Sequence, residues 1–253
     1  MRTRNDLDLY ERNAECWWAP DDRFFRSLRS VGEFHVELVR REWSKHLVGA
    51  RAIELGCGGG LVSLALARLG ARVTGVDSSA GSVRAARGEA ARRRSSSRFV
   101  CADLYRCPLT SGSFDLAVMT DVLEHLEDPA AALREASRLL RPGGRLYLNT
   151  FDRSLLSRVA VVELAERLGF VPRGTHDARL FVRPDELGRH ARSAGLVLER
   201  LIWERPALVR SALTWTIHLK EAERGVAFSA FLVKEAASRA RSARHYIIPR
   251  LVP

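Results

Sequence analysis

Three ionisable side chains at spacing i, i+3, i+4 follow an apolar run near the middle of the chain. Asp121, Glu124 and His125 share one face if the segment after that run is helical. His125 would then serve as a general base, or the trio would bind a divalent cation such as Mg²⁺. A third interpretation is a helix N-cap with exposed charges. We take Glu124 and His125 as candidate catalytic residues and all three as candidate metal ligands.

A second histidine of interest lies further along the chain, in the polar turn Gly174–Asp177. His176 is a candidate acid or base, or a group that binds the substrate. A histidine that only stabilises the turn is an equally open interpretation.

The strongest local motif is a glycine-rich loop, Glu54-Leu-Gly56-Cys-Gly58-Gly59-Gly60. It follows a predicted strand and opens a predicted helix. Glycines allow a sharp turn and a close approach of the backbone to a ligand, and the helix start offers free N–H groups. Gly56 and Gly58 are therefore candidate cofactor-binding residues. Such a loop alone is also typical of dinucleotide sites.

Two carboxylates narrow the choice of cofactor. Asp77, followed by Ser78, ends the second predicted strand, where a carboxylate can accept hydrogen bonds from both ribose hydroxyls of NAD or of S-adenosylmethionine. Glu54 favours S-adenosylmethionine, because an acid there suits the methionine ammonium and would repel a pyrophosphate. A loop carboxylate satisfied within the protein is the alternative for Glu54.

The ends of two further strands complete the expected cofactor site. Asp103 is placed to accept a hydrogen bond from the adenine amino group, with Leu104 beside the ring; a turn or N-cap aspartate is the alternative. Thr120 ends the fourth strand. In an open parallel sheet these strand ends converge on one edge, where ligands bind.

The elements that must position these groups alternate along the chain. Apolar strands and helical patterns follow one another from residue 51 to residue 151, which predicts parallel strands with crossover helices. Two later strands look like an antiparallel pair. The fold class is therefore α/β and Rossmann-like, with a seven-stranded, mostly parallel sheet and helices on both faces. The predicted strands are 51–55, 71–77, 97–104, 113–119, 145–151, 195–203 and 224–233.

We expect four regions. Residues 1–48 read as an N-terminal helical cap, and 49–151 together with 190–235 as the cofactor-binding domain. Residues 152–189 interrupt the alternation as an insertion or lid. Residues 236–253 form a basic tail that is partly disordered or packs on a partner.

The ordered motifs resemble those of class I S-adenosylmethionine-dependent methyltransferases. The segments E-L-G-C-G-G-G, V-T-G-V-D, F-D-L-A-V and L-R-P-G-G occur in the family's order between residues 50 and 150. Nucleic-acid methyltransferases that act on base amino groups usually carry an N/D-P-P-Y/F motif after the fourth strand. Thr120-Asp121-Val-Leu stands there instead, so a nucleic-acid substrate is disfavoured.

Three more segments resemble the O-methyltransferases of ubiquinone biosynthesis. They are Cys16-Trp-Trp-Ala-Pro20, Asp121-Val-Leu-Glu-His125 and Val171-Pro-Arg-Gly-Thr-His-Asp177 with Phe181–Leu187. The resemblance implies O-methylation of a phenolic or catechol hydroxyl, on a quinone precursor or a similar lipophilic aromatic. It also supports metal binding by the trio, in which Asp121 replaces a glutamate. The tryptophan pair would cap the active site or stack on the substrate, although core packing is open for one of them.

This chain departs from the family's pattern at two places, one expected at the cofactor and one expected at the substrate. The family's arginine for the cofactor carboxylate has no counterpart at its place, His35–Val36, and Arg40 or Arg41 is a possible substitute. The family's Tyr-Asn-Pro is replaced around Trp203–Pro206. A tailoring methyltransferase for a soluble natural product is therefore a rival interpretation, and a non-catalytic S-adenosylmethionine-binding module is another.

The predicted insertion carries an apolar stripe flanked by arginines. The stripe comprises Leu155, Leu156, Val159, Val162 and Leu168. A helix of this kind can lie on an anionic membrane, or it can be a lid packed on its own domain.

Composition sets outer limits on these expectations. No stretch has the roughly 20 apolar residues of a membrane span, the charged N-terminus lacks the features of a signal peptide, and the 4 cysteines suggest neither disulfides nor zinc. We therefore expect a cytoplasmic protein, in peripheral contact with a membrane at most. The net charge of +11 is compatible with a drift of the overall composition toward arginine, without function, or with attraction to anionic lipid.

Overall fold

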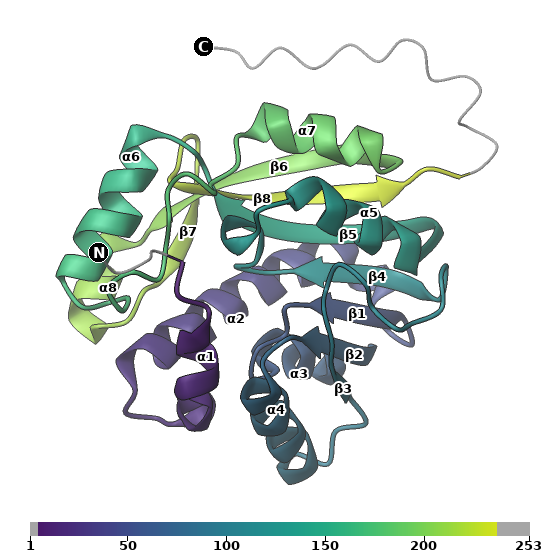
Figure 1. Ribbon diagram of the computed structural model, residues 1–253, viewed down its shortest axis with the longest axis horizontal. Helices are drawn as coiled ribbons and strands as arrows, with labels where there is room; N and C mark the ends of the chain where they lie inside the picture. Colours follow the sequence, from purple (N-terminus) through teal and green to yellow (C-terminus); the bar gives the residue numbers. More distant parts are fainter. Residues whose placement is uncertain (1–4, 237–253) are drawn as a thin grey trace.

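One eight-stranded sheet forms the centre of the computed structural model, which describes residues 5–236 (Figure 1). The strands lie in the order β3-β2-β1-β4-β5-β8-β6-β7. Their bounds are β1 Arg51–Leu55, β2 Arg72–Asp77, β3 Arg98–Cys101, β4 Phe114–Met119, β5 Leu140–Phe151, β6 Leu196–Pro206, β7 Leu219–Ala222 and β8 Ala227–Lys234.

The first five strands of this order are parallel, and β8 lies antiparallel between β5 and β6. This arrangement confirms the predicted α/β fold and the antiparallel pair at its end. The prediction of seven strands was wrong by one. The additional strand β7 pairs with the end of β6 through Trp203–Pro206. Its sequence, Leu-Lys-Glu-Ala, is short and charged, as edge strands often are, and it lacks the apolar alternation of an inner strand.

Helices cover both faces of the sheet (Figure 1). One face carries α2, α3 and α4, and the other carries α5 and α7. The bounds are α1 Asp8–Arg12, α2 Arg23–Trp43, α3 Leu61–Arg68, α4 Ala80–Arg92, α5 Pro129–Leu139, α6 Leu155–Ser157, α7 Pro184–Ser193 and α8 Leu208–Thr214, with short 3₁₀ turns η1 Ala14–Trp18, η2 Ser44–His46 and η3 Leu123–His125 and the π-helix η4 Arg158–Ala165. Helix α2 begins after Asp22, whose carboxylate accepts the N–H of Phe25 at 2.9 Å as an N-cap.

The core is divided by the sheet into two main apolar layers. Leu146 and Leu148 of β5 point to the α5 and α7 side, whereas Tyr147 between them points toward α2. This alternation is the two-residue period of a strand that is buried on both faces. It carries Asn149 and Thr150 to opposite faces at the carboxyl end of β5.

The insertion predicted at 152–189 contains α6, η4, the Gly174–Asp177 turn and the first part of α7. It lies at one end of the sheet beside α8, where the rings of Phe170 and Trp215 stack at 6.0 Å (Figure 1). The four region boundaries stay predictions. The tail expected at 236–253 lies, apart from residue 236, outside the described residues. Within residues 5–236, no helix combines the length and apolar character needed to cross a membrane.

Candidate active site

The glycine loop turns the chain from β1 into α3 beneath a cavity of about 140 Å³. Gly56, Gly58 and Gly60 adopt positive φ angles of 78°, 47° and 81°, a region that side chains disfavour. The N–H groups of Gly56 and Cys57 both donate to the carbonyl of Val76, at 2.8 and 3.0 Å. The loop is therefore tied to the end of β2, where Asp77 follows.

The packing of Trp17 explains why two positions of the loop are glycine. A Cβ atom added at Gly58 or at Gly59 would overlap the Trp17 ring. Trp17 is buried, donates from Nε1 to the Ser82 hydroxyl at 2.9 Å and lines the cavity. Trp18 instead donates from Nε1 to the Gly59 carbonyl at 3.0 Å. Of the tryptophan pair, Trp17 is thus the cavity wall, packed against the loop.

Asp77 lies at the carboxyl end of β2 and lines the cavity. Its two oxygens accept the N–H groups of Gly58 and Ser79, each at 2.8 Å. Burial raises the pKa of Asp77, and these hydrogen bonds oppose that rise. Each carboxylate oxygen has a further lone pair, so the group can still accept ribose hydroxyls.

Glu54, one residue before the end of β1, also lines the cavity and is buried. Its Oε2 accepts the Ser63 hydroxyl of α3. Burial raises the pKa of Glu54 to about 8. A cationic group beside it would restore the charged form, which is the electrostatic complement of an ammonium.

The other predicted cofactor residues divide into two sets. Ser78, Leu104 and Thr120 line the cavity with Gly56 and Gly58. Asp103 does not. Its Oδ1 accepts the N–H of Tyr105 at 2.8 Å in an exposed turn, which is the turn aspartate named as its alternative.

The predicted helix carrying Asp121, Glu124 and His125 on one face is wrong. After β4 the chain makes the 3₁₀ turn η3, Leu123–His125, and α5 begins only at Pro129. Asp121 has a φ of 54°, outside any right-handed helix. The side chain that joins Glu124 and His125 is His176, and the three ligand-type atoms lie within 4.8 Å of one another. Asp121 is not part of that group.

The cluster of Glu124, His125 and His176 is buried. The two imidazole rings are nearly parallel, with centroids 5.3 Å apart. Glu124 Oε2 accepts the Thr150 hydroxyl at 3.0 Å, whereas its Oε1 makes no hydrogen bond to a described residue. Burial raises the pKa of Glu124 to about 8 and lowers that of His125 to about 4, and it lowers the pKa of His176 as well. Both rings are therefore neutral near pH 7.

Several residues of the site were not predicted from the sequence, among them Tyr10, Asn5 and Asn149. Tyr10 lines the cavity, stacks on Trp17 at 5.8 Å and meets the edge of His125 at 6.3 Å. Asn5 hydrogen-bonds to His125, and Asn149 to Asp121. Only Asn149 carried a signal, as a polar residue inside an apolar strand. Tyr10 and Asn5 reach the site through tertiary packing alone.

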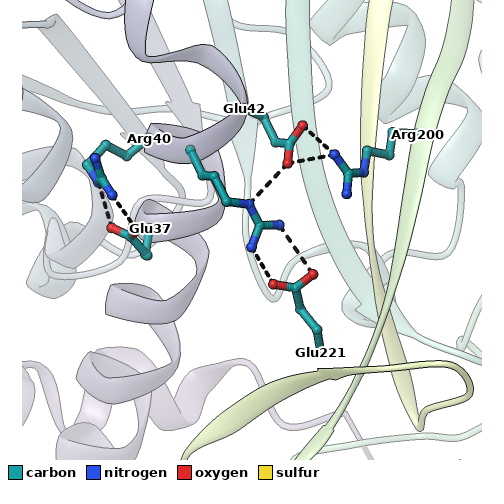
Figure 2. A network of polar contacts seen from close by, with 6 residues as sticks. Glu37, Arg40, Glu42, Arg200 and Glu221 are labelled. Atoms are coloured by element: carbon teal, nitrogen blue, oxygen red, sulfur yellow. Dashed lines mark hydrogen bonds and ion pairs between the residues drawn. The ribbon is translucent and has the colours of Figure 1, made fainter.

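The possible substitutes for the missing arginine lie elsewhere. Arg40 forms an ion pair with Glu37, and Arg41 bonds to Glu42 and Glu221, in the network shown in Figure 2. Glu42 also pairs with Arg200 of β6, so the network links α2 with β6 and β7 on the surface. Among the described residues that line the cavity there is no arginine or lysine, so neither Arg40 nor Arg41 takes the expected place.

Comparison with known proteins agrees with this geometry. Residues 53–148 match the model of a methyltransferase domain. A magnesium protoporphyrin IX methyltransferase from Synechocystis, solved with bound S-adenosylhomocysteine, superposes with a TM-score of 0.65 at 17% identity over 91% of this chain and 96% of its own. A methyltransferase from Thermotoga maritima gives a TM-score of 0.64 at 24% identity, over 90% and 98%. These structures share the fold.

Sequence relatives are more specific. Ubiquinone biosynthesis O-methyltransferase from Marinobacter nauticus is 32% identical over 78% of this chain and 84% of its own length. The protein of the same name from Methylococcus capsulatus is 34% identical, over 76% and 81%.

The fold and the cavity at its strand ends define a class I S-adenosylmethionine-dependent methyltransferase. Within that class, the chain belongs to the ubiquinone biosynthesis O-methyltransferase family, as its motifs predicted.

Proposed function

We propose that this methyltransferase transfers the methyl group of S-adenosylmethionine to a phenolic or catechol hydroxyl of a quinone precursor or a similar lipophilic aromatic. The relatives named above support this acceptor class. The observation that carries the proposal is the buried cluster of Glu124, His125 and His176, of which His125 opens onto the cofactor cavity.

The cavity would hold the cofactor by charge and by shape. Asp77 would accept the ribose hydroxyls, Glu54 the methionine ammonium, and Leu104 would pack beside the adenine ring. The loop and the strand ends would add contacts from Gly56, Gly58, Ser78 and Thr120. Methyl transfer is an in-line displacement, so this hold must align the sulfur, the methyl group and the acceptor oxygen.

The acceptor hydroxyl must lose a proton as it attacks. A neutral imidazole is a proton acceptor, and burial keeps both His125 and His176 neutral near pH 7 by lowering their pKa values. Glu124, held by Thr150 at 3.0 Å, would orient the acceptor through its second oxygen, Oε1. This assigns catalysis to three buried groups that face one another.

The same three groups fit a divalent cation. Two imidazoles and a carboxylate suit Mn²⁺, Fe²⁺ or Zn²⁺ better than Mg²⁺, which prefers oxygen ligands. The buried Oε1 of Glu124, without a hydrogen bond to a described residue, is consistent with a ligand role. Glu124, His125 and His176 would hold the ion, and Asp121 would not, because it lies outside the group. When bound, such a cation lowers the pKa of a phenol beside it.

The test is turnover of defined acceptors. Purified protein is incubated with S-adenosylmethionine and either a catechol that carries a short prenyl tail or the same catechol without a tail, and the products are identified by mass spectrometry. We expect an O-methylated product and a higher kcat/KM for the prenylated catechol. Equal kcat/KM for the two would favour the soluble-phenol rival, and cofactor binding without any product would favour the non-catalytic module.

We also propose that the face formed by the insertion and α8 contacts an anionic membrane. The predicted stripe does not pack as a whole on the domain. Val162 is buried, but Leu155, Leu156, Val159 and Leu168 are exposed. Helix α8 adds exposed apolar side chains beside them. These are Leu208, Val209 and Leu213, each 74% exposed or more, and Trp215 directly after the helix.

One cation, Arg23, joins the two halves of this apolar face. The guanidinium of Arg23 lies 4.6 Å from the Phe170 ring and 4.8 Å from the Trp215 ring, so it sits between the insertion and α8. The same two segments also carry the exposed Arg158, Arg167 and Arg210, of which Arg158 forms an ion pair with Glu163. Exposed apolar residues with flanking arginines are what an interfacial contact with anionic lipid requires.

Co-sedimentation with liposomes tests the membrane contact. The wild type should pellet with vesicles that contain phosphatidylglycerol. The double variant Val209→Glu with Leu213→Glu should stay in the supernatant, because it places two charges on the exposed apolar face of α8. The matched control is Val48→Glu, at an exposed apolar position outside this face, and it should pellet. A double variant that pellets like the wild type would contradict the proposal.

A further inference from the structure

The N-terminal segment, Asn5–Arg12, lies over the cofactor cavity and is fixed at both ends. At its start, the N–H of Asn5 donates to the carbonyl of Gly174 at 2.8 Å. Near its end, the Glu11 carboxylate accepts the N–H of Gly81 at 2.7 Å, at the beginning of α4. Two side chains between these points, Leu7 and Tyr10, line the cavity. The segment therefore joins the cofactor side of the site to the Gly174–Asp177 turn.

Asn5 also binds His125 twice. Its Oδ1 lies 2.7 Å from the ring Nδ1, and its Nδ2 donates to the His125 carbonyl at 3.0 Å. An amide oxygen can only accept a hydrogen bond, so Nδ1 must carry the proton. In a neutral imidazole the other nitrogen, Nε2, then holds the lone pair. The side-chain amide of Asn5 thus selects one tautomer of His125.

We propose that Asn5 is a positioning residue that holds His125 in the Nδ1–H form, so that Nε2 is the atom that accepts the proton or binds a cation. The inference rests on the proposed role of His125. Metal-binding histidines are commonly oriented in this way by a hydrogen bond at the second nitrogen, and its loss typically costs roughly 10- to 100-fold.

The segment also couples cofactor binding to this orientation. Tyr10 of the same segment lines the cavity and stacks on Trp17, while Asn5 holds His125 and the backbone two residues before His176. Cofactor contact and histidine orientation therefore depend on one docked segment. The methyl acceptor meets an oriented Nε2 only when that segment is in place.

Two variants and a control from the same segment test the assignment. Asn5→Ala should lower kcat by about 10- to 100-fold with little change in KM for the acceptor, because it frees the ring of His125 without removing it. Asn5→Asp keeps an oxygen acceptor for Nδ1–H but loses the donor to the His125 carbonyl, so it should restore part of kcat relative to Asn5→Ala. Asp6→Ala, which removes the exposed ion pair with Arg12, should behave like the wild type.

A spectroscopic measurement separates orientation from simple loss of structure. ¹⁵N NMR of full-length protein with ¹⁵N-labelled histidine and bound S-adenosylhomocysteine should show the Nδ1–H form for His125, identified by the loss of its signals in His125→Gln. Asn5→Ala should shift His125 toward a mixture of tautomers, and Asn5→Asp should not. An Nε2–H form in the wild type, or an unchanged tautomer and kcat in Asn5→Ala, would overturn the inference. If the wild type methylates no phenol, the proposed function fails, and the NMR result still decides the tautomer.

Discussion

Asp121 and Asn149 bind each other twice across the ends of β4 and β5. The Asp121 N–H donates to Asn149 Oδ1 at 3.0 Å, and Asn149 Nδ2 donates to Asp121 Oδ1 at 2.8 Å. The pair holds Asp121 at a φ of 54°, which is unfavourable for a residue with a side chain. It thereby turns the chain away from β4 and into η3, where Glu124 and His125 lie.

Loss of this pair should destabilise the fold. In Asn149→Leu the Asp121 N–H loses its partner, and we expect the free energy of unfolding to fall by about 2 kcal/mol in urea denaturation. Adding Asp121→Gly should recover part of the loss, because glycine adopts a positive φ without strain. A double variant less stable than Asn149→Leu alone would contradict this account of the turn.

The cluster predicts which variants separate catalysis from cofactor binding. Glu124→Gln and His176→Gln should each lower kcat by about 100-fold or more. Neither residue lines the cofactor cavity, so the Kd for S-adenosylhomocysteine, measured by calorimetry, should stay within about threefold of the wild-type value. An equal loss of cofactor affinity and kcat would mean that these residues only maintain the shape of the site.

Asp77 and Asp103 give opposite predictions for cofactor binding. Asp77→Ala removes a cavity-lining carboxylate that also holds the Gly58 and Ser79 N–H groups, so the Kd for S-adenosylhomocysteine should rise by about 100-fold or more. Asp103→Ala changes an exposed turn and should shift the Kd by less than about threefold. A large effect of Asp103→Ala would restore its predicted contact with adenine.

Gly59→Ala tests the contact between the glycine loop and Trp17. The added Cβ would overlap the Trp17 ring, so we expect a loss of about 1–3 kcal/mol in the free energy of unfolding. In the Gly59→Ala background, Trp17→Leu should lower the free energy of unfolding by less than it does in the wild type, because the added methyl group and the Trp17 ring occupy the same space. Gly88→Ala is the control: nothing lies within 4 Å of its added Cβ, and it should be neutral or stabilising.

Glu204 predicts a pH dependence of stability. It lies buried in β6, accepts the Ser229 hydroxyl, and burial raises its pKa from an ordinary value of 4.5 to about 8. Between these values the folded state holds a proton that the unfolded state has lost. The free energy of unfolding should therefore fall as the pH rises from 4.5 to 8, by up to about 1.4 kcal/mol per pH unit for this group.

Glu204→Gln isolates that contribution. The amide keeps an oxygen for the Ser229 hydroxyl and cannot ionise. The buried histidines, whose lowered pKa values act in the opposite direction below pH 6.5, are present in both proteins. Because His35 Nδ1 lies 3.8 Å from Glu204 Oε1, the comparison is clearest above pH 6.5, where the histidines are neutral. Relative to Glu204→Gln, the wild type should lose stability steadily from pH 4.5 to 8 in urea titrations. Parallel curves for the two proteins would show that Glu204 ionises normally.

Several features of this fold and site could be predicted from the amino-acid sequence alone. The strand and helix alternation, the glycine loop and Asp77 depend on local periodicity and on short motifs, and the structure places them as expected. Strand β7 was missed because its Leu-Lys-Glu-Ala sequence has no apolar face. The helix through Asp121 was wrong because spacing alone cannot reveal a residue with a positive φ.

The sequence by itself determined the alternation of strands and helices that builds the parallel sheet. It also determined the family to which the chain belongs, because both depend on patterns of a few neighbouring residues. Tertiary structure alone decided which groups meet: His176 with Glu124 and His125, Asn5 with His125, and Asn149 with Asp121. The two hydrogen-bonded pairs among these are 120 and 28 positions apart. Contacts over such separations arise from the packing of whole elements, and no local pattern of residue types encodes them.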